Sequence, residues 1–142
     1  MRVLFDVNVL IALLDPGHVH HDRAHVWWEQ NRTSGWASCP LTQNGFVRVM
    51  SQSGYPNSVA TPEAIRILGM ATRQQEHAFW PDDSSITDSG RFRSERILGP
   101  RQVTDLYLLS LAVQRDGRLA TFDRTIPLSA VVGAKSKHLA VL

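Results

Sequence analysis

The hydrophobic and polar positions along this chain fall into short blocks that predict strands and helices in turn. Apolar runs of about four to eight residues, closed by polar or turn residues, are typical of buried strands, and apolar positions three or four apart are typical of helices. The predicted strands are residues 2–5, 35–39, 77–81, 118–123 and 138–142. The predicted helices are residues 7–14, 20–32, 40–52, 61–74, 88–97 and 103–117.

This order of elements predicts the fold class. Strands that alternate with helices are joined by right-handed crossovers, which produce a mainly parallel sheet with helices on both faces. We therefore expect an α/β protein, a three-layer α/β/α sandwich around a mainly parallel central sheet. A length of 142 residues suits one core, so residues 1–142 are expected to form a single domain.

The clearest helix in the pattern is residues 103–117. Its sequence, VTDLYLLSLAVQRDG, has apolar residues on nearly every side, which predicts a central, buried helix. Thr104 is the expected residue at its amino-terminal cap, and Gly117 is expected to end it.

Three aspartates fall where predicted elements meet. Asp6 ends the first strand, Asp105 opens the buried helix, and Asp123 ends the strand that follows that helix. In open α/β sheets, ligands bind outside the carboxyl ends of the strands, at the point where the strand order reverses. We therefore expect all three carboxylates to lie at that edge of the sheet.

Three anions close together repel one another unless a cation lies between them. A set of carboxylate oxygens suits Mg²⁺ or Mn²⁺, which would also compensate the burial of Asp6 in an apolar run. Separate structural roles are the alternative. Asp6 could cap the following helix, Asp105 could favour the helix dipole, and Asp123 could pair with Arg124 or end a turn.

Composition narrows the class of protein. Apolar residues make up 43% and charged residues 20%, and no apolar run is long enough to span a membrane, so we expect a soluble globular protein. The single Cys39 excludes an internal disulfide framework, and no signal peptide precedes the first strand, which favours the cytoplasm. The basic residues are thirteen arginines and two lysines, and the guanidinium group suits phosphate binding, although charge alone does not establish a nucleic-acid partner.

The segments FDVNVLIAL, TDLYLLSLA and RLATFDR resemble the PIN-domain family, specifically the ribonuclease toxins of bacterial VapBC toxin–antitoxin modules. The intervening helix with two tryptophans and the segment CPLTQNGFVRV follow in the order that the family uses, so the resemblance covers nearly the whole chain. It implies an Mg²⁺-dependent or Mn²⁺-dependent endoribonuclease that acts on structured RNA such as tRNA or ribosomal RNA. It also implies a cognate VapB-like antitoxin that holds the enzyme inactive, and a homodimer.

Asp6, Asp105 and Asp123 match acidic positions of the PIN site, and the resemblance implies that they bind the metal. The fourth position, usually glutamate, falls on Gln43, which can offer an amide oxygen but has no charge and cannot act as a general base. A branch with native glutamine, a weakened nuclease and an engineered change are three explanations for Gln43. Residues expected to orient ligands or water, or to contact the RNA backbone, are Asn8, Thr121 and Arg124; local turn bonding or solvation is the alternative for each.

Other functions remain as alternatives. A catalytically weakened PIN-fold module that binds RNA or an antitoxin would fit Gln43. A haloacid-dehalogenase-type phosphatase also begins with a strand that ends in aspartate, but it needs a second aspartate two residues later, where this chain has Asn8. His21 and His25 lie four residues apart and could share a helix face, but the nearby sequence offers no further ligands to complete a zinc site, which favours helix packing.

Overall fold

The computed structural model describes all 142 residues and contains one five-stranded sheet. Its strands are β1 (Val3–Phe5), β2 (Trp36–Ser38), β3 (His77–Phe79), β4 (Arg118–Thr121) and β5 (Leu139–Val141). They lie in the order β3-β2-β1-β4-β5, and every neighbouring pair is parallel. The chain builds outward from β1 to β3 and then returns to the other side of β1. The strand order therefore reverses between β1 and β4, which is where an open α/β sheet binds ligands.

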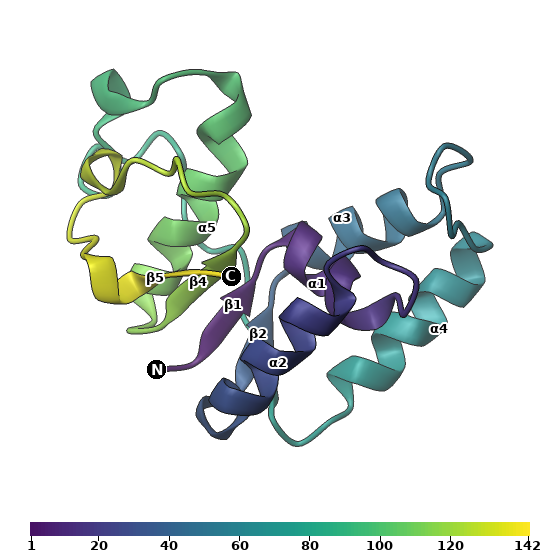
Figure 1. Ribbon diagram of the computed structural model, residues 1–142. Coiled ribbons are helices and arrows are strands. Elements are labelled where there is room, and N and C mark those ends of the chain that lie inside the picture. Colours follow the sequence, from purple (N-terminus) through teal and green to yellow (C-terminus); the bar gives the residue numbers. More distant parts are fainter.

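Helices cover both faces of this sheet (Figure 1). One face is covered by α1 (Val7–Leu14), α2 (His21–Asn31), α3 (Pro40–Met50) and α4 (Thr61–Thr72). The other is covered by α5 (Val103–Gln114) and the irregular segments around it. The predicted three-layer α/β/α sandwich is confirmed. None of the helices combines the length and the apolar character that a membrane span needs.

The two faces of the sheet bury separate apolar clusters because side chains alternate along each strand. Val3 and Phe5 of β1 pack with α1, α3 and α4, whereas Leu4 packs against α5. The cluster around α5 also takes in Trp80 and Phe92, which belong to the connection between β3 and α5. This long connection thus completes the second helical layer.

The predicted helix at residues 88–97 is wrong. Asp88 accepts a hydrogen bond from the N–H group of Gly90 at 2.8 Å, which favours a turn, and Phe92 forms an antiparallel bridge with Val131. Only a short 3₁₀ turn, η2 (Ser94–Arg96), is present. Burial of Phe92 therefore fixes this segment against the residues that follow β4.

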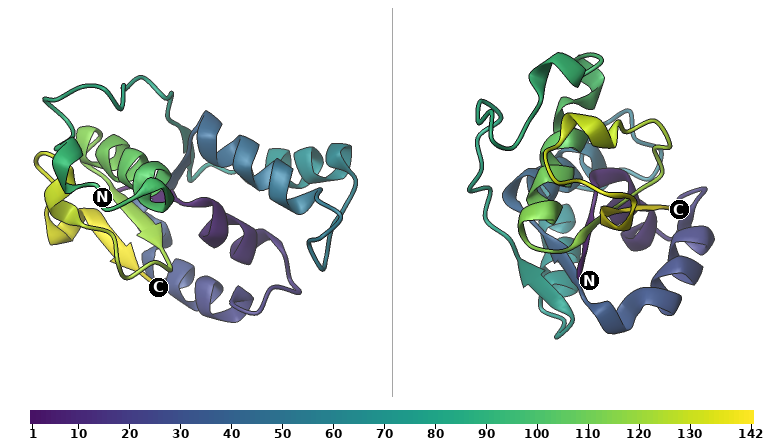
Figure 2. Two further views of the ribbon diagram at one scale, coloured as in Figure 1. Left: turned by 90° about the horizontal axis from the view of Figure 1, so that it is seen from above. Right: turned by 90° about the vertical axis from the view of Figure 1, so that its left-hand side faces the viewer.

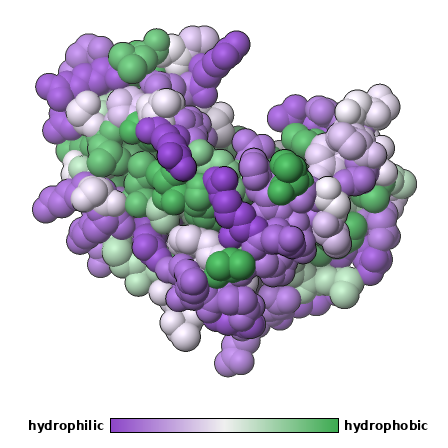
Figure 3. All heavy atoms as spheres, in the orientation of Figure 1, coloured by the Kyte–Doolittle hydropathy of each residue, from purple (hydrophilic) through white to green (hydrophobic).

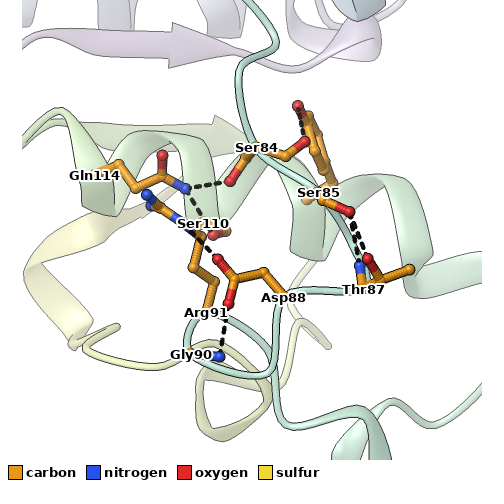
Figure 4. Close-up of polar contacts among 9 residues, drawn as sticks. Ser84, Ser85, Thr87, Asp88, Gly90, Arg91, Ser110 and Gln114 are labelled. Atoms are coloured by element: carbon orange, nitrogen blue, oxygen red, sulfur yellow. Dashed lines mark hydrogen bonds and ion pairs between the residues drawn. The ribbon is translucent and has the colours of Figure 1, made fainter.

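Polar side chains attach the same connection to the second half of α5 (Figure 4). Gln114 donates hydrogen bonds to the hydroxyl groups of Ser84 at 2.7 Å and Ser110 at 3.2 Å. The hydroxyl of Tyr107 donates to the carbonyl of Ser84 at 3.2 Å. From above, the segment arches from the α3 side of the sheet to the α5 side (Figure 2). These contacts hold the segment around Ser84 against α5.

The ends of α5 differ from the predicted caps. Thr104 lies within the helix, whose capping residue is Gln102, because the 3₁₀ turn η3 (Pro100–Gln102) leads directly into it. At the other end, Asp116 adopts the left-handed conformation with φ of 51°. Gly117 is needed for space, since a Cβ atom there would lie 2.7 Å from the carbonyl oxygen of Arg2.

The buried carboxylate of Asp15, at the end of α1, joins the loop after α1 to the loop between α3 and α4. Asp15 accepts hydrogen bonds from the N–H group of Gly17 at 2.9 Å, from the amide of Asn57 at 3.1 Å and from the hydroxyl of Tyr55. Burial raises the pKa of Asp15, but these three donors lower it more, so the net pKa lies below its usual value.

We expect Asp15→Ala to lower the free energy of unfolding by about 2–4 kcal/mol, because three donors lose their common acceptor. Urea unfolding at neutral pH measures the effect. Because the folded-state pKa is depressed, this contribution is present above pH 4 and is lost as the pH falls through the folded-state pKa. The difference between wild type and variant should therefore shrink in acid; an undiminished difference at pH 2 would contradict the role of the charge.

Candidate active site at the carboxyl edge of the sheet

Asp6 lies at the junction between β1 and α1. The strand ends at Phe5 and the helix begins at Val7, so Asp6 is the capping residue, and its Oδ1 atom accepts the N–H group of Val9 at 2.7 Å. Only 5% of Asp6 is exposed. The predicted capping role is therefore real, but it occupies one carboxylate oxygen and does not neutralise the charge.

The environment of Asp6 disfavours its ionised form. Its pKa is raised from 3.8 to about 6, mainly by burial and in part by the charge of Asp105, although hydrogen bonds from the hydroxyl of Thr121 and the N–H group of Val9 lower it. At neutral pH the side chain is therefore an anion held at an energetic cost. A cation at this position would offset both the energetic cost of burying the Asp6 charge and its repulsion by Asp105.

Asp105 lies in the first turn of α5 and is half-buried. Burial raises its pKa, and repulsion from Asp123 raises it further. The acidic charges of Asp6 and Asp105, and those of Asp105 and Asp123, thus lie close enough to repel each other. The structure brings the three predicted carboxylates to one edge of the sheet.

Asp123 follows β4 and is held by the turn that it begins. Its Oδ1 atom accepts the N–H group and the hydroxyl of Thr125, at 2.7 and 2.6 Å, and its own N–H group donates to the hydroxyl oxygen of Thr121 at 3.0 Å. Its other carboxylate oxygen accepts no hydrogen bond. Asp123 therefore combines the predicted turn role with one oxygen that can bind a ligand.

No basic side chain neutralises these three carboxylates. The ion pairs of the protein involve Glu29, Glu63, Glu76, Asp83 and Asp88, which all lie elsewhere. Arg124 is exposed and forms no ion pair with Asp123, so that predicted alternative is not present. The charges of the three carboxylates are therefore not compensated by ion pairs within the protein.

The donor set fits a hard divalent cation. Asp6, Asp105 and Asp123 offer oxygen atoms alone, the carboxylate of Asp105 accepts no hydrogen bond, and Asp123 keeps one oxygen free of hydrogen bonds. No three acidic, histidine or cysteine side chains converge closely enough to enclose an ion by themselves. This arrangement suits Mg²⁺ or Mn²⁺, which bind through one or two carboxylates and keep several of their waters.

Thr121 and Asn8 flank the carboxylates in different ways. Thr121 is buried, and its hydroxyl contacts both Asp6 and the backbone of Asp123. Asn8 is exposed in the first turn of α1, and its backbone N–H group lies against the Asp6 carboxylate. Thr121 therefore fixes the relative position of two acids, whereas the side chain of Asn8 faces solvent.

Gln43 is engaged elsewhere. Its amide Nε2 atom donates to the hydroxyl of Ser38 at 2.9 Å, and that hydroxyl contacts Nε2 of His77 at 2.8 Å. The side chain of Gln43 also lines a groove between α3 and α4. No hydrogen bond joins Gln43 to the three aspartates, because the one hydrogen bond of its side chain goes to Ser38 of β2.

This arrangement predicts the effect of restoring a glutamate. The amide of Gln43 donates a hydrogen bond to the hydroxyl oxygen of Ser38, so the hydroxyl hydrogen of Ser38 is donated to a ring nitrogen of neutral His77. Burial lowers the pKa of His77 and so favours this neutral form. A glutamate would accept that hydrogen, so we expect Gln43→Glu to raise the pKa of His77 and to change RNA cleavage by no more than about threefold. Histidine titration by NMR and a cleavage assay measure the two effects. A tenfold gain in cleavage would instead place residue 43 with the carboxylates.

Two residues at this edge were not predicted as functional. Asp82, which follows β3, accepts the N–H group of Leu41 at 3.0 Å and so stabilises the start of α3. Its position after a strand is the same signal that identified Asp6 and Asp123. Cys39 is fully buried, which raises the pKa of its thiol, as expected for a packed residue and not for a nucleophile.

The histidines of α2 bind the end of α1 and leave no ligand set for zinc. A ring nitrogen of His21 contacts the carbonyl oxygen of Ala12 at 2.7 Å, and one of His25 contacts that of Leu13 at 3.1 Å. Both side chains thus contact carbonyls in the last turn of α1. The predicted preference for helix packing agrees with these contacts.

The carboxyl edge opens into a hollow in the molecular surface. In the space-filling view, a notch separates the side built by α5 and its preceding loops from the side built by α3 and α4 (Figure 3). In the same orientation, the start of α1, which follows Asp6, lies below this notch (Figure 1).

Comparison with known proteins agrees with this geometry. The profile of the PIN domain matches residues 3–131, which include all three aspartates. The chain belongs to the PIN-domain family. It is 53% identical to ribonuclease VapC44 of Mycobacterium tuberculosis over the full length of both chains. It is 41% identical to ribonuclease VapC39 of the same species, over 94% of this chain and 96% of the relative.

A solved structure shares the fold of this PIN domain. The crystal structure of VapBC2 from Rickettsia felis, bound to a DNA fragment from its promoter, superimposes with a TM-score of 0.62 at 17% identity, over 89% of this chain and 94% of the other. At that identity the likeness concerns the fold. The predicted class, a VapC-like PIN-domain endoribonuclease of the toxin–antitoxin type, is confirmed by the family and the sequence relatives.

Proposed function

We propose that this PIN domain cleaves structured RNA, such as tRNA or ribosomal RNA, in a reaction that depends on Mg²⁺ or Mn²⁺ at the carboxyl edge of the sheet. The observation that carries the proposal is the group of three uncompensated carboxylates, Asp6, Asp105 and Asp123, at the point where the strand order reverses. Such a group is costly in isolation and becomes favourable only with a cation.

The residues of the chain have distinct roles in this proposal. Asp6 and Asp105 hold the ion, and Asp123 contacts it directly or through water. Thr121 fixes Asp6 relative to Asp123, and Asn8 orients water at the exposed side. Gln43 is not assigned to the ion, because its amide is bonded to Ser38.

The rigid attachment of the carboxylates supports this assignment. Asp6 is fixed by the start of α1, and Asp123 by its turn with Thr125, so neither has to be ordered when substrate arrives. The ion, when bound, supplies Lewis acidity that withdraws charge from a phosphate oxygen and favours deprotonation of water near neutral pH. Burial of Asp6 excludes solvent from its side of the site.

We further propose that the partner is a VapB-like antitoxin and that the enzyme is a homodimer acting in the cytoplasm. Trp28 lines a largely apolar cavity of about 210 Å³ with Phe5, Leu10 and Trp36, which supports a protein partner over α1 and α2. Apolar side chains of α4, such as Ile65 and Met70, are more than half exposed and support a second interface.

Cleavage of labelled tRNA and ribosomal RNA by the purified protein tests the proposed function. We expect discrete fragments with Mg²⁺ or Mn²⁺, and none after addition of EDTA. Fragments that persist in EDTA would contradict metal dependence. Binding of both RNAs without cleavage in any divalent metal would instead support a catalytically weakened binding module.

A further inference from the structure

The arginines of this protein divide into paired and unpaired groups. Arg32, Arg66, Arg91 and Arg115 form ion pairs with nearby acids. Arg101 and Arg124 are exposed and form neither an ion pair nor a side-chain hydrogen bond, although Arg124 follows Asp123 directly and Arg101 lies four residues before Asp105. Their guanidinium groups are therefore free to bind another anion.

Both free arginines are placed at the acidic edge by the local chain. Arg101 belongs to η3, which continues into α5, so it lies about one helical turn before Asp105. Arg124 immediately follows Asp123 in the loop after β4. The two arginines thus approach the carboxylates from two separate segments.

A glutamine ties these two segments together. Gln102 accepts the N–H group of Leu98 at 3.1 Å and donates to the carbonyl of Thr125 at 3.4 Å. Thr125 is itself held by the carboxylate of Asp123. The side chain of Gln102 therefore sets the spacing between the loop that carries Arg101 and the loop that carries Arg124.

We propose that Arg101 and Arg124 bind backbone phosphates of the RNA on the two sides of the phosphate that faces Asp6 and Asp105, and that Gln102 fixes their spacing. This inference rests on the proposed function. The acidic site by itself repels a polyanion, so cationic groups beside it are needed for binding. The guanidinium fork presents paired donors that match a phosphate group.

Affinity for RNA in the absence of cleavage tests this proposal. Fluorescence anisotropy with labelled bulk tRNA, in EDTA and on an Asp6→Asn background, measures binding at several salt concentrations. We expect Arg101→Gln and Arg124→Gln each to weaken binding about five- to tenfold near 0.1 M salt. Each should also reduce the slope of log affinity against log salt by about 0.7 to 0.9, which corresponds to one lost phosphate contact.

Arg73 provides a matched control. It is exposed and forms no ion pair, but it follows α4 and precedes β3, so it lies at the opposite edge of the sheet. Arg73→Gln removes the same charge and should change affinity less than twofold. Equal losses for Arg73→Gln and Arg101→Gln would overturn the proposal, because binding would then depend only on net charge.

The proposed role of Gln102 predicts a different change in affinity and in its salt dependence. We expect Gln102→Leu to weaken tRNA binding about threefold without changing the salt dependence, since no phosphate contact is removed. A reduced slope would overturn its role as a spacer. Unchanged binding in the Arg101 and Arg124 variants of an enzyme that cleaves RNA would overturn this inference alone, whereas absence of cleavage by the wild type would overturn the proposed function alone.

Discussion

Replacement of Asp6 by asparagine should stabilise the metal-free protein and abolish RNA cleavage at the same time. The rise in the pKa of Asp6 from 3.8 to about 6 corresponds to about 3 kcal/mol of destabilisation when the buried carboxylate is ionised. Asparagine keeps the oxygen that accepts the N–H group of Val9 and removes the charge. We therefore expect the free energy of unfolding at pH 7 to rise by about 2–3 kcal/mol in EDTA, as measured by urea unfolding.

The pH dependence of this difference identifies its cause. The folded-state pKa of Asp6 is raised, so the folded protein keeps its proton to higher pH than the unfolded chain, and the contribution of this group to stability is lost as the pH rises from 4 to 6. The advantage of Asp6→Asn should thus be near zero at pH 4 and complete at pH 7. A variant less stable than wild type at pH 7 would show that Asp6 is mainly a structural cap.

Replacement of Asp105 by asparagine should reduce RNA cleavage by a factor on the order of 10² to 10³, because the site loses one of the two carboxylates proposed to hold the ion. Asp105 is only half-buried and forms no hydrogen bond with its carboxylate, so its removal should change the free energy of unfolding by less than about 1 kcal/mol. Single-turnover cleavage of labelled tRNA and urea unfolding measure the two effects.

Asp116 offers a matched control for this variant. It is exposed, lies between α5 and β4 at the opposite edge of the sheet, and adopts a left-handed conformation that asparagine also tolerates. Asp116→Asn should cleave RNA at the wild-type rate. Equal losses in the two variants would mean that net charge, and not the position of the carboxylate, controls the reaction.

The fold was predictable because hydrophobic pattern and chain order determine it together. Short apolar runs gave the positions of all five strands, and their alternation with helices gave a parallel sheet. The position of the aspartates followed from this topology, since the ends of β1 and β4 must meet at one edge. Burial of Asp6 in an apolar run was the local signal for the site.

The features that could not be predicted from the sequence depend on contacts between segments that are far apart in the chain. The segment around Phe92 contains no α-helix, because that side chain enters the core beside α5 and its backbone pairs with Val131. The direction of the Gln43 amide is set by Ser38 and His77, which belong to two other elements. The sequence around residue 43 predicts a helix. It does not show which face of that helix lies against Ser38 and His77.

Calorimetric titration of the metal-free protein with Mn²⁺ tests the central claim most directly, namely that a divalent cation neutralises the carboxylates at this edge. We predict saturable binding to the wild type and to Asp116→Asn, and binding at least tenfold weaker to Asp6→Asn and Asp105→Asn. Equal Mn²⁺ affinity in all four proteins would contradict the account, because the ion would then bind somewhere other than these aspartates.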